Sequence, residues 1–169
     1  TGLSELGWVH GVESQIDMEE GTPCVSILEG SENNEEDATE ANRVSYSNMS
    51  INIPEGWEYE INEYTEGSSS FGISFWPEGE TEGKLKFLYY EAFGVCGTGL
   101  SQEIIKIGNY EASKATYGNS KVWNFITLRV EPRWYVILNE GANEWLAKRM
   151  DEVMAIIETI CVAEEAFTE

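Results

Sequence analysis

Short segments with alternating apolar residues fill most of the chain between residues 45 and 138, and turn residues separate them. Segment 45–53 carries apolar residues at alternate positions near its end, and Pro54-Glu55-Gly56 then supplies a turn. The next segments of this kind are 57–61, 71–76 and 84–90. Such alternation, with Gly, Pro or Asn between the segments, is typical of β-strands joined by tight turns. The pattern therefore predicts a fold built mainly from antiparallel strands.

The alternation is most regular in the second half of this stretch. Segments 103–107 and 110–117 are separated by Gly108-Asn109, a Gly-first connection of two residues that is typical of a β-hairpin. Further turns at 118–120 and 131–133 lead into segments 122–130 and 134–138. We predict an antiparallel meander over residues 103–138. Because segment 122–130 is apolar on both faces, it should be a central strand that is covered at least in part on both sides.

A single helical pattern follows the strands. Asn143 is a suitable N-cap, and Glu144 places a negative charge in the first turn, where it suits the helix dipole. One apolar stripe is formed by Leu146, Met150, Val153, Met154, Ile157 and Ile160. The stripe predicts a helix from Asn143 to Ile160 that packs on one face of the sheet. The predicted fold class is therefore α+β, with a mostly antiparallel sheet and a C-terminal helix.

The composition divides the chain into three parts. Residues 1–43 form a weakly patterned leader that ends in an acidic linker, because residues 31–42 contain no large apolar side chain. Residues 44–162 form the predicted domain, and residues 163–169 form a tail. The chain begins at Thr1 without a methionine, so we expect it to be a fragment whose upstream part carried a signal or a membrane tether.

The charge of the chain excludes some classes of partner. Ten basic residues stand against 31 acidic ones, which gives a net charge of −21. Such a chain is repelled by nucleic acid and by anionic membrane surfaces. No stretch approaches the ~20 apolar residues that span a bilayer, so we expect no membrane insertion. The acidic, aromatic-rich composition favours a protein that is secreted or anchored outside the membrane.

The stretch from Phe93 to Leu100 packs three glycines, a cysteine and a threonine between the predicted strands. Cys96 is the main candidate for a reactive residue, since a thiol near free backbone amides becomes a better nucleophile. The alternative is a sharp architectural turn in which glycine permits unusual backbone angles and Cys96 is a small buried residue. The order of the glycines does not match a dinucleotide-binding or phosphate-binding loop.

The three cysteines, Cys24, Cys96 and Cys161, show no metal-binding spacing, and His10 is the only histidine. We therefore expect no metal site and no cofactor. Two states of the cysteines remain open. One is a disulfide between Cys96 and Cys161 with one free thiol, and the other is three buried free cysteines.

Six tryptophans are the remaining candidates for a binding surface. Four of them lie on predicted strands, where packing in the core is the ordinary role. Trp8, Trp76 and Trp145 are expected to be the most exposed, and together with Cys96 they are the possible binding residues. Exposed tryptophans of this kind could hold a protein partner or stack on a carbohydrate.

Two short motifs carry a resemblance to known families. Ile51-Asn-Ile-Pro-Glu-Gly-Trp57 resembles the opening of bacterial lipoprotein domains in the PsbP-like superfamily. The run Cys96-Gly-Thr-Gly-Leu100, the segment Trp123-Asn-Phe-Ile126 and the closing segment 155–160 resemble uncharacterised extracytoplasmic domains of gut Clostridia. The resemblance implies an antiparallel sheet flanked by a helix, outside the membrane, that serves as a binding or assembly module. It transfers no functional residue.

These observations lead to one main functional hypothesis and two alternatives. No catalytic signature is present, and the abundant carboxylates single out no acid and base pair. We expect a noncatalytic extracytoplasmic binding or interaction module and no enzyme. The alternatives are a thiol-dependent enzyme or redox sensor that uses Cys96, and a structural or sensor domain of a membrane-tethered protein.

Overall fold

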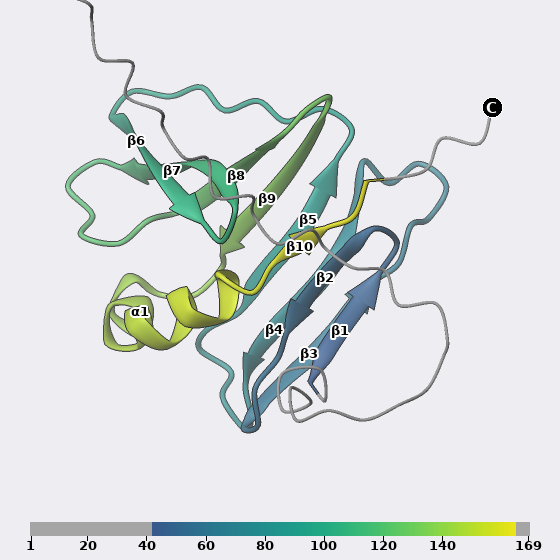
Figure 1. Cartoon of the computed structure of the whole chain (residues 1–169). Coiled ribbons are helices and arrows are strands. Elements are labelled where there is room, and N and C mark those ends of the chain that lie inside the picture. Colours follow the sequence, from purple (N-terminus) through teal and green to yellow (C-terminus); the bar gives the residue numbers. More distant parts are fainter. Residues whose placement is uncertain (1–41, 165–169) are drawn as a thin grey trace, which may run out of the picture.

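The computed structural model describes residues 42–164, which form two antiparallel sheets and one helix (Figure 1). The larger sheet has seven strands in the order β3-β4-β5-β9-β8-β7-β6. Its strands are β3 (Trp57–Asn62), β4 (Ser70–Pro77), β5 (Leu85–Tyr90), β6 (Leu100–Ile107), β7 (Tyr110–Tyr117), β8 (Phe125–Val130) and β9 (Arg133–Asn139). The predicted antiparallel meander is confirmed, because β6, β7, β8 and β9 are consecutive neighbours.

The smaller sheet consists of β1 (Arg43–Tyr46), β2 (Met49–Asn52) and β10 (Cys161–Val162), with β2 in the centre. The prediction of one continuous strand over 45–53 is wrong. Ser47 adopts a φ of 55°, and the chain reverses there into a hairpin in which Tyr46 pairs with Met49. A positive φ at serine has no strong sequence signal, which explains why the turn was not predicted.

The core lies between the large sheet and a second layer made of the small sheet and the helix. Met49 and Ile51 of β2 are fully buried, as are Phe75 of β4 and Ile137 of β9, and all belong to one cluster. Figure 1 shows the small sheet in front of β3, β4 and β5, with the helix beside it. The fold is therefore α+β with the sheets strongly dominant, which is the mostly antiparallel architecture that the alternation predicted.

The helix α1 (Asn143–Ile157) is shorter than the predicted helix, which ended at Ile160. Asn143 is its first residue rather than its cap, because the capping position belongs to Ala142, which makes no side-chain capping bond. At the other end, the Thr159 hydroxyl donates to the Ile156 carbonyl over 2.6 Å and accepts from the Asn52 amide over 2.9 Å. These bonds lead the chain out of the helix and into β10.

The large sheet has a second face, which points away from the small sheet, and we call it the outer face. Directly paired residues share a face, so the register places Phe125, Val136 and Leu88 on it. Phe125 is 4% exposed, and Ile126 on the core side is fully buried. Segment 122–130 was predicted to be a central strand that is covered at least in part on both sides, and this is confirmed for β8. The strand itself begins only at Phe125.

The cover of the outer face is the connection from β5 to β6, residues 91–99. The two strands are separated by β9, β8 and β7, so this connection has to cross the sheet. Phe93 lies on Tyr90 and on Phe125, with ring centroids 5.3 Å and 5.5 Å apart, and belongs to a second apolar cluster. The glycine-rich stretch is therefore the crossover of the sheet. Its predicted architectural role is correct in that it connects the early strands to the meander, but it is not a sharp turn, and Cys96 is exposed rather than buried.

Candidate binding site

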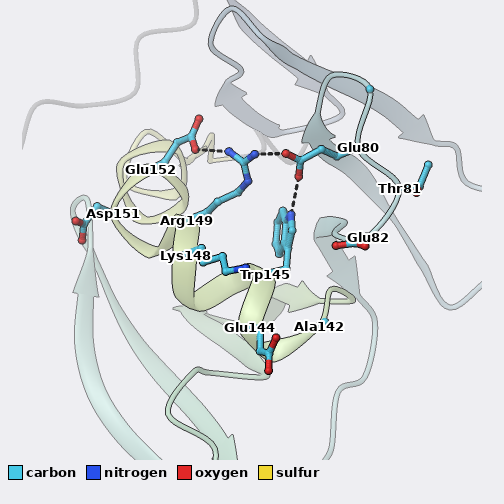
Figure 2. A pocket seen from close by; sticks show the side chains of 11 residues that line it. Glu80, Thr81, Glu82, Ala142, Glu144, Trp145, Lys148, Arg149, Asp151 and Glu152 are labelled. Atoms are coloured by element: carbon cyan, nitrogen blue, oxygen red, sulfur yellow. Dashed lines mark hydrogen bonds and ion pairs between the residues drawn. The ribbon is translucent and has the colours of Figure 1, made fainter.

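A cavity of about 870 Å³ opens between the β4–β5 loop and α1 (Figure 2). The loop contributes Gly79, Glu80, Thr81 and Glu82, and the helix side contributes Ala142, Glu144, Trp145, Lys148, Arg149, Asp151 and Glu152. The lining is mostly charged, so the cavity is wet and open rather than a closed apolar pocket. Its chemistry depends on which of these charged groups are already paired.

One hydrogen-bonded network, which we call the clasp, joins the loop to the helix. Arg149 lies between two carboxylates: it donates to Glu80 and, over 2.9 Å, to Glu152 (Figure 2). Trp145 donates its indole N–H to the other oxygen of Glu80 over 2.8 Å. Trp57 of β3 donates to the other oxygen of Glu152 over 2.7 Å. Each oxygen of both carboxylates therefore has a donor.

The indole of Trp145 is held in a slot that only glycine permits. A Cβ atom at Gly83 would lie 1.9 Å from the ring, and one at Gly141 would lie 2.7 Å from it. Trp145 is accordingly only 7% exposed. The expectation that Trp145 is among the most exposed tryptophans is wrong, because the two glycines that make room for it lie in the loops before β5 and before the helix.

The clasp is built to hold charge rather than to transfer protons. The hydrogen bond from Trp145 lowers the pKa of Glu80, burial opposes this, and Arg149 lowers the pKa further. A carboxylate with a lowered pKa stays ionised near neutral pH and is a poor general acid or base there. With its carboxylates and guanidinium occupied by one another, the clasp joins the loop to the helix and is not the best candidate for a ligand site.

A second candidate lies on the outer face, where one row of side chains crosses five neighbouring strands. From β5 to β6 this row, which we call the outer row, consists of Tyr90, Trp134, Arg129, Glu111 and Lys106. Tyr90 pairs with Trp134, Trp134 pairs with Arg129, and Glu111 pairs with Lys106. Arg129 and Glu111 are joined by an ion pair of 2.6 Å.

The crossover covers the outer row at Tyr90, where Phe93 lies, and the rest of the row remains accessible. Trp134 is 42% exposed, and Ile104, which lies beside the row on β6, is 63% exposed. Arg129 and Glu111 are also exposed. The row thus presents an aromatic end at Trp134 and a charged end at Lys106 on the outer face of the sheet.

The structure places the predicted site residues apart from one another. Trp76 lies on the outer face of β4, donates to Glu58 over 2.8 Å and is covered by Lys84, whose Nζ lies 4.6 Å from the ring centroid. Trp145 belongs to the clasp. Trp8 lies outside the described residues. Trp134, which the strand pattern assigned to the core, is instead an exposed member of the outer row.

The cysteines agree with the prediction of a disulfide together with a free thiol, but not with the predicted pair. Cys96 is free and exposed in the crossover, whereas Cys161 is in a disulfide whose partner lies outside residues 42–164. The predicted pairing of Cys96 with Cys161 is therefore wrong, and so is the alternative of three buried free thiols. Cys96 is carried by the crossover rather than by the core, and that position accounts for its exposure.

Within residues 42–164, no cluster of histidine, cysteine and carboxylate groups is suited to hold a metal ion. No helix of this part of the chain is both long enough and apolar enough to cross a membrane.

Comparison with protein-family models, with curated proteins and with solved structures finds no match to this chain. The resemblance to PsbP-like lipoprotein domains therefore stays a prediction.

The outer row was missed because strand pattern alone does not show which face of a sheet is left open. A sequence signal nevertheless existed in the charge distribution. Residues 100–139 contain five basic residues and three acidic ones, a net charge of +2, whereas the rest of the chain has five and 28, a net charge of −23. The meander thus differs in the sign of its charge from the rest of the chain taken together, and it contains four of the five members of the outer row.

Proposed function

We propose that this chain is a noncatalytic, extracytoplasmic binding module that contacts a partner protein through the outer row. The observation that carries the proposal is the exposed indole of Trp134 between Tyr90 and Arg129 on an open sheet face. Tryptophan, tyrosine and arginine are the residues that most often supply binding energy at protein interfaces. A flat row that joins an aromatic end to an ion pair suits a protein surface better than a single sugar ring.

Two further observations support the proposal. The disulfide at Cys161 favours an oxidising compartment, since disulfides form and persist mainly outside the cytoplasm. The clasp uses its carboxylates and arginine internally, so it offers no open acid and base pair for catalysis. In addition to these two observations, the net charge of +2 over residues 100–139 gives a partner an approach that the acidic remainder of the chain does not.

Site-specific photo-crosslinking in the producing cells tests the proposal. A photoreactive phenylalanine derivative replaces Trp134 in one variant and Tyr59 in a control, because Tyr59 is an aromatic residue of β3 that is 52% exposed. We expect a discrete protein adduct at position 134, and we expect Arg129→Glu in the same chain to diminish it. Equal adducts at both positions, or none at 134, would count against the outer row.

A further inference from the structure

The seven-stranded sheet has two edges, and they differ in how well they are protected. At the β3 edge, exposed Glu58 and Glu60 discourage the addition of another strand. At the β6 edge, the register runs without a bulge from Leu100 paired with Tyr117 to Ile107 paired with Tyr110. The strand contains no proline. Within residues 42–164, β7 is the only strand that pairs with β6, so one side of the β6 backbone is open to another strand.

The side chains along this edge define what kind of strand would fit. On the outer face, Ile104 is 63% exposed and Lys106 is exposed beside it. On the core side, Glu103 already pairs with Lys114 over 2.7 Å, and Ile105 packs partly against the core. Next to the neutral Gln102, the outer face of this edge therefore offers one apolar side chain, Ile104, and one cation, Lys106, two residues apart.

We infer that β6 receives an extended, acidic segment of the partner protein, which adds to the sheet as an eighth strand. The inference rests on the proposed function, because the outer row ends at Lys106 on this same edge. Backbone hydrogen bonds would supply the pairing, and alternate side chains would supply the specificity. The segment carries an apolar residue opposite Ile104 and a carboxylate opposite Lys106. The net charge of +2 over residues 100–139 favours an acidic segment locally.

A second copy of this chain is a poorer occupant of the edge. An antiparallel pair of β6 strands that centres on Ile104 would place Lys106 opposite Gln102 and leave it without a carboxylate on that face. Two copies would also bring two net charges of −21 together. Self-association is therefore an outcome of the test rather than the proposal.

The test uses the full chain and a capped synthetic peptide, Thr-Asp-Thr-Val-Thr-Val-Thr. In an antiparallel register its Asp meets Lys106 and the first Val meets Ile104. We expect the peptide to protect backbone amides of β6 from hydrogen exchange and to shift their NMR signals. An analogue in which Lys replaces Asp should bind more weakly, and an analogue with N-methylated backbone amides should not bind.

Charge reversal on the protein gives the decisive comparison. Lys106→Glu should weaken binding of the Asp peptide by about tenfold and strengthen binding of the Lys peptide. Lys148→Glu, an equal change of charge on α1, should alter neither. Each variant counts as folded when its NMR signals outside the substituted region match those of the wild type.

Three results would overturn the inference. The first is no protection of β6 by any peptide, and the second is signal shifts confined to the surroundings of Trp134, which would leave the proposed function standing. The third is protection of β6 without peptide, together with a doubled mass in analytical ultracentrifugation, which would assign the edge to a second copy. Conversely, β6 protection without crosslinking at Trp134 would leave the edge as the contact and remove the outer row.

Discussion

The three buried tryptophans, Trp57, Trp123 and Trp145, differ more in their hydrogen bonds than in their burial. Trp57 and Trp145 both donate to carboxylates of the clasp. Trp123 is only 2% exposed, and its indole N–H has no acceptor among the described residues. A buried donor without a partner costs about 1 to 3 kcal/mol, whereas a bond to a charged group stabilises. Replacing Trp57 or Trp123 by the same residue should therefore lower the free energy of unfolding by different amounts.

Trp123→Phe should destabilise the protein much less than Trp57→Phe does. Both changes remove similar ring area, but the first also removes an unpaired donor, and the second removes a bond to Glu152 and leaves its oxygen unpaired. We expect the free energies of unfolding of the two variants to differ by about 2 kcal/mol or more. Urea denaturation measures both. Equal losses would show that the N–H of Trp123 has an acceptor in solution.

The state of the cysteines can be checked by alkylation. Because Cys96 is exposed and Cys161 is in a disulfide, iodoacetamide should add one equivalent to the folded protein at Cys96 and none at Cys161. Intact mass and peptide mapping measure this. An alkylation rate at Cys96 well above that of a model peptide would favour the alternative of a thiol-dependent enzyme or sensor. If Cys96 reacts only after unfolding, its exposure in the folded protein is contradicted.

At the scale of the elements, the positions of the strands followed from the alternation, whereas the ends of the elements did not. The hairpin between β1 and β2 depends on a positive φ at Ser47. The end of α1 depends on Thr159, which bonds to Ile156 of the helix and to the distant Asn52 of β2. The clasp could not be predicted, because it joins Glu80 to Arg149 across elements that only the fold brings together.

Glu80→Gln should make stability less dependent on pH. The folded pKa of Glu80 is lowered from 4.5, so the stabilisation by its charge is present above the unfolded pKa and is lost as the pH falls through the folded pKa. The variant should therefore be less stable than the wild type near pH 7, and the difference should shrink as the pH falls through 4.5 and below it.

Glu82→Gln is the matched control, since Glu82 lines the same cavity outside the clasp. Chemical denaturation at each pH measures the effect. A difference that grows as the pH falls would show that the charge of Glu80 opposes folding.

On the scale of the whole molecule, the charge is unevenly distributed: the meander has a net charge of +2 and the remainder −23. From the total charge we expect that nucleic acid is not a partner, and this stays a prediction. The total does not reveal that the meander differs in sign from the rest of the chain. Which face of the meander is open depends on the path of the crossover, which the strand pattern does not determine.

The melting temperature should rise when salt is added at neutral pH. Repulsion among the excess carboxylates opposes the compact state, and salt at about 0.1 M screens charges beyond about 10 Å. Differential scanning calorimetry in increasing NaCl measures the shift. Near the isoelectric point, where the net charge vanishes, the shift should disappear. A melting temperature that falls with salt would show that the ion pairs outweigh the repulsion.

The crossover also has a consequence for the order of folding. It divides the large sheet into two halves with local connections, β3-β4-β5 and β6 to β9, which meet only where β5 pairs with β9. Such distant pairing requires a large loop to close, so it should form late. Leu88 faces Val136 across this seam. In stopped-flow experiments, Leu88→Ala should speed unfolding and leave the rate of folding nearly unchanged, as expected where two preformed halves dock last.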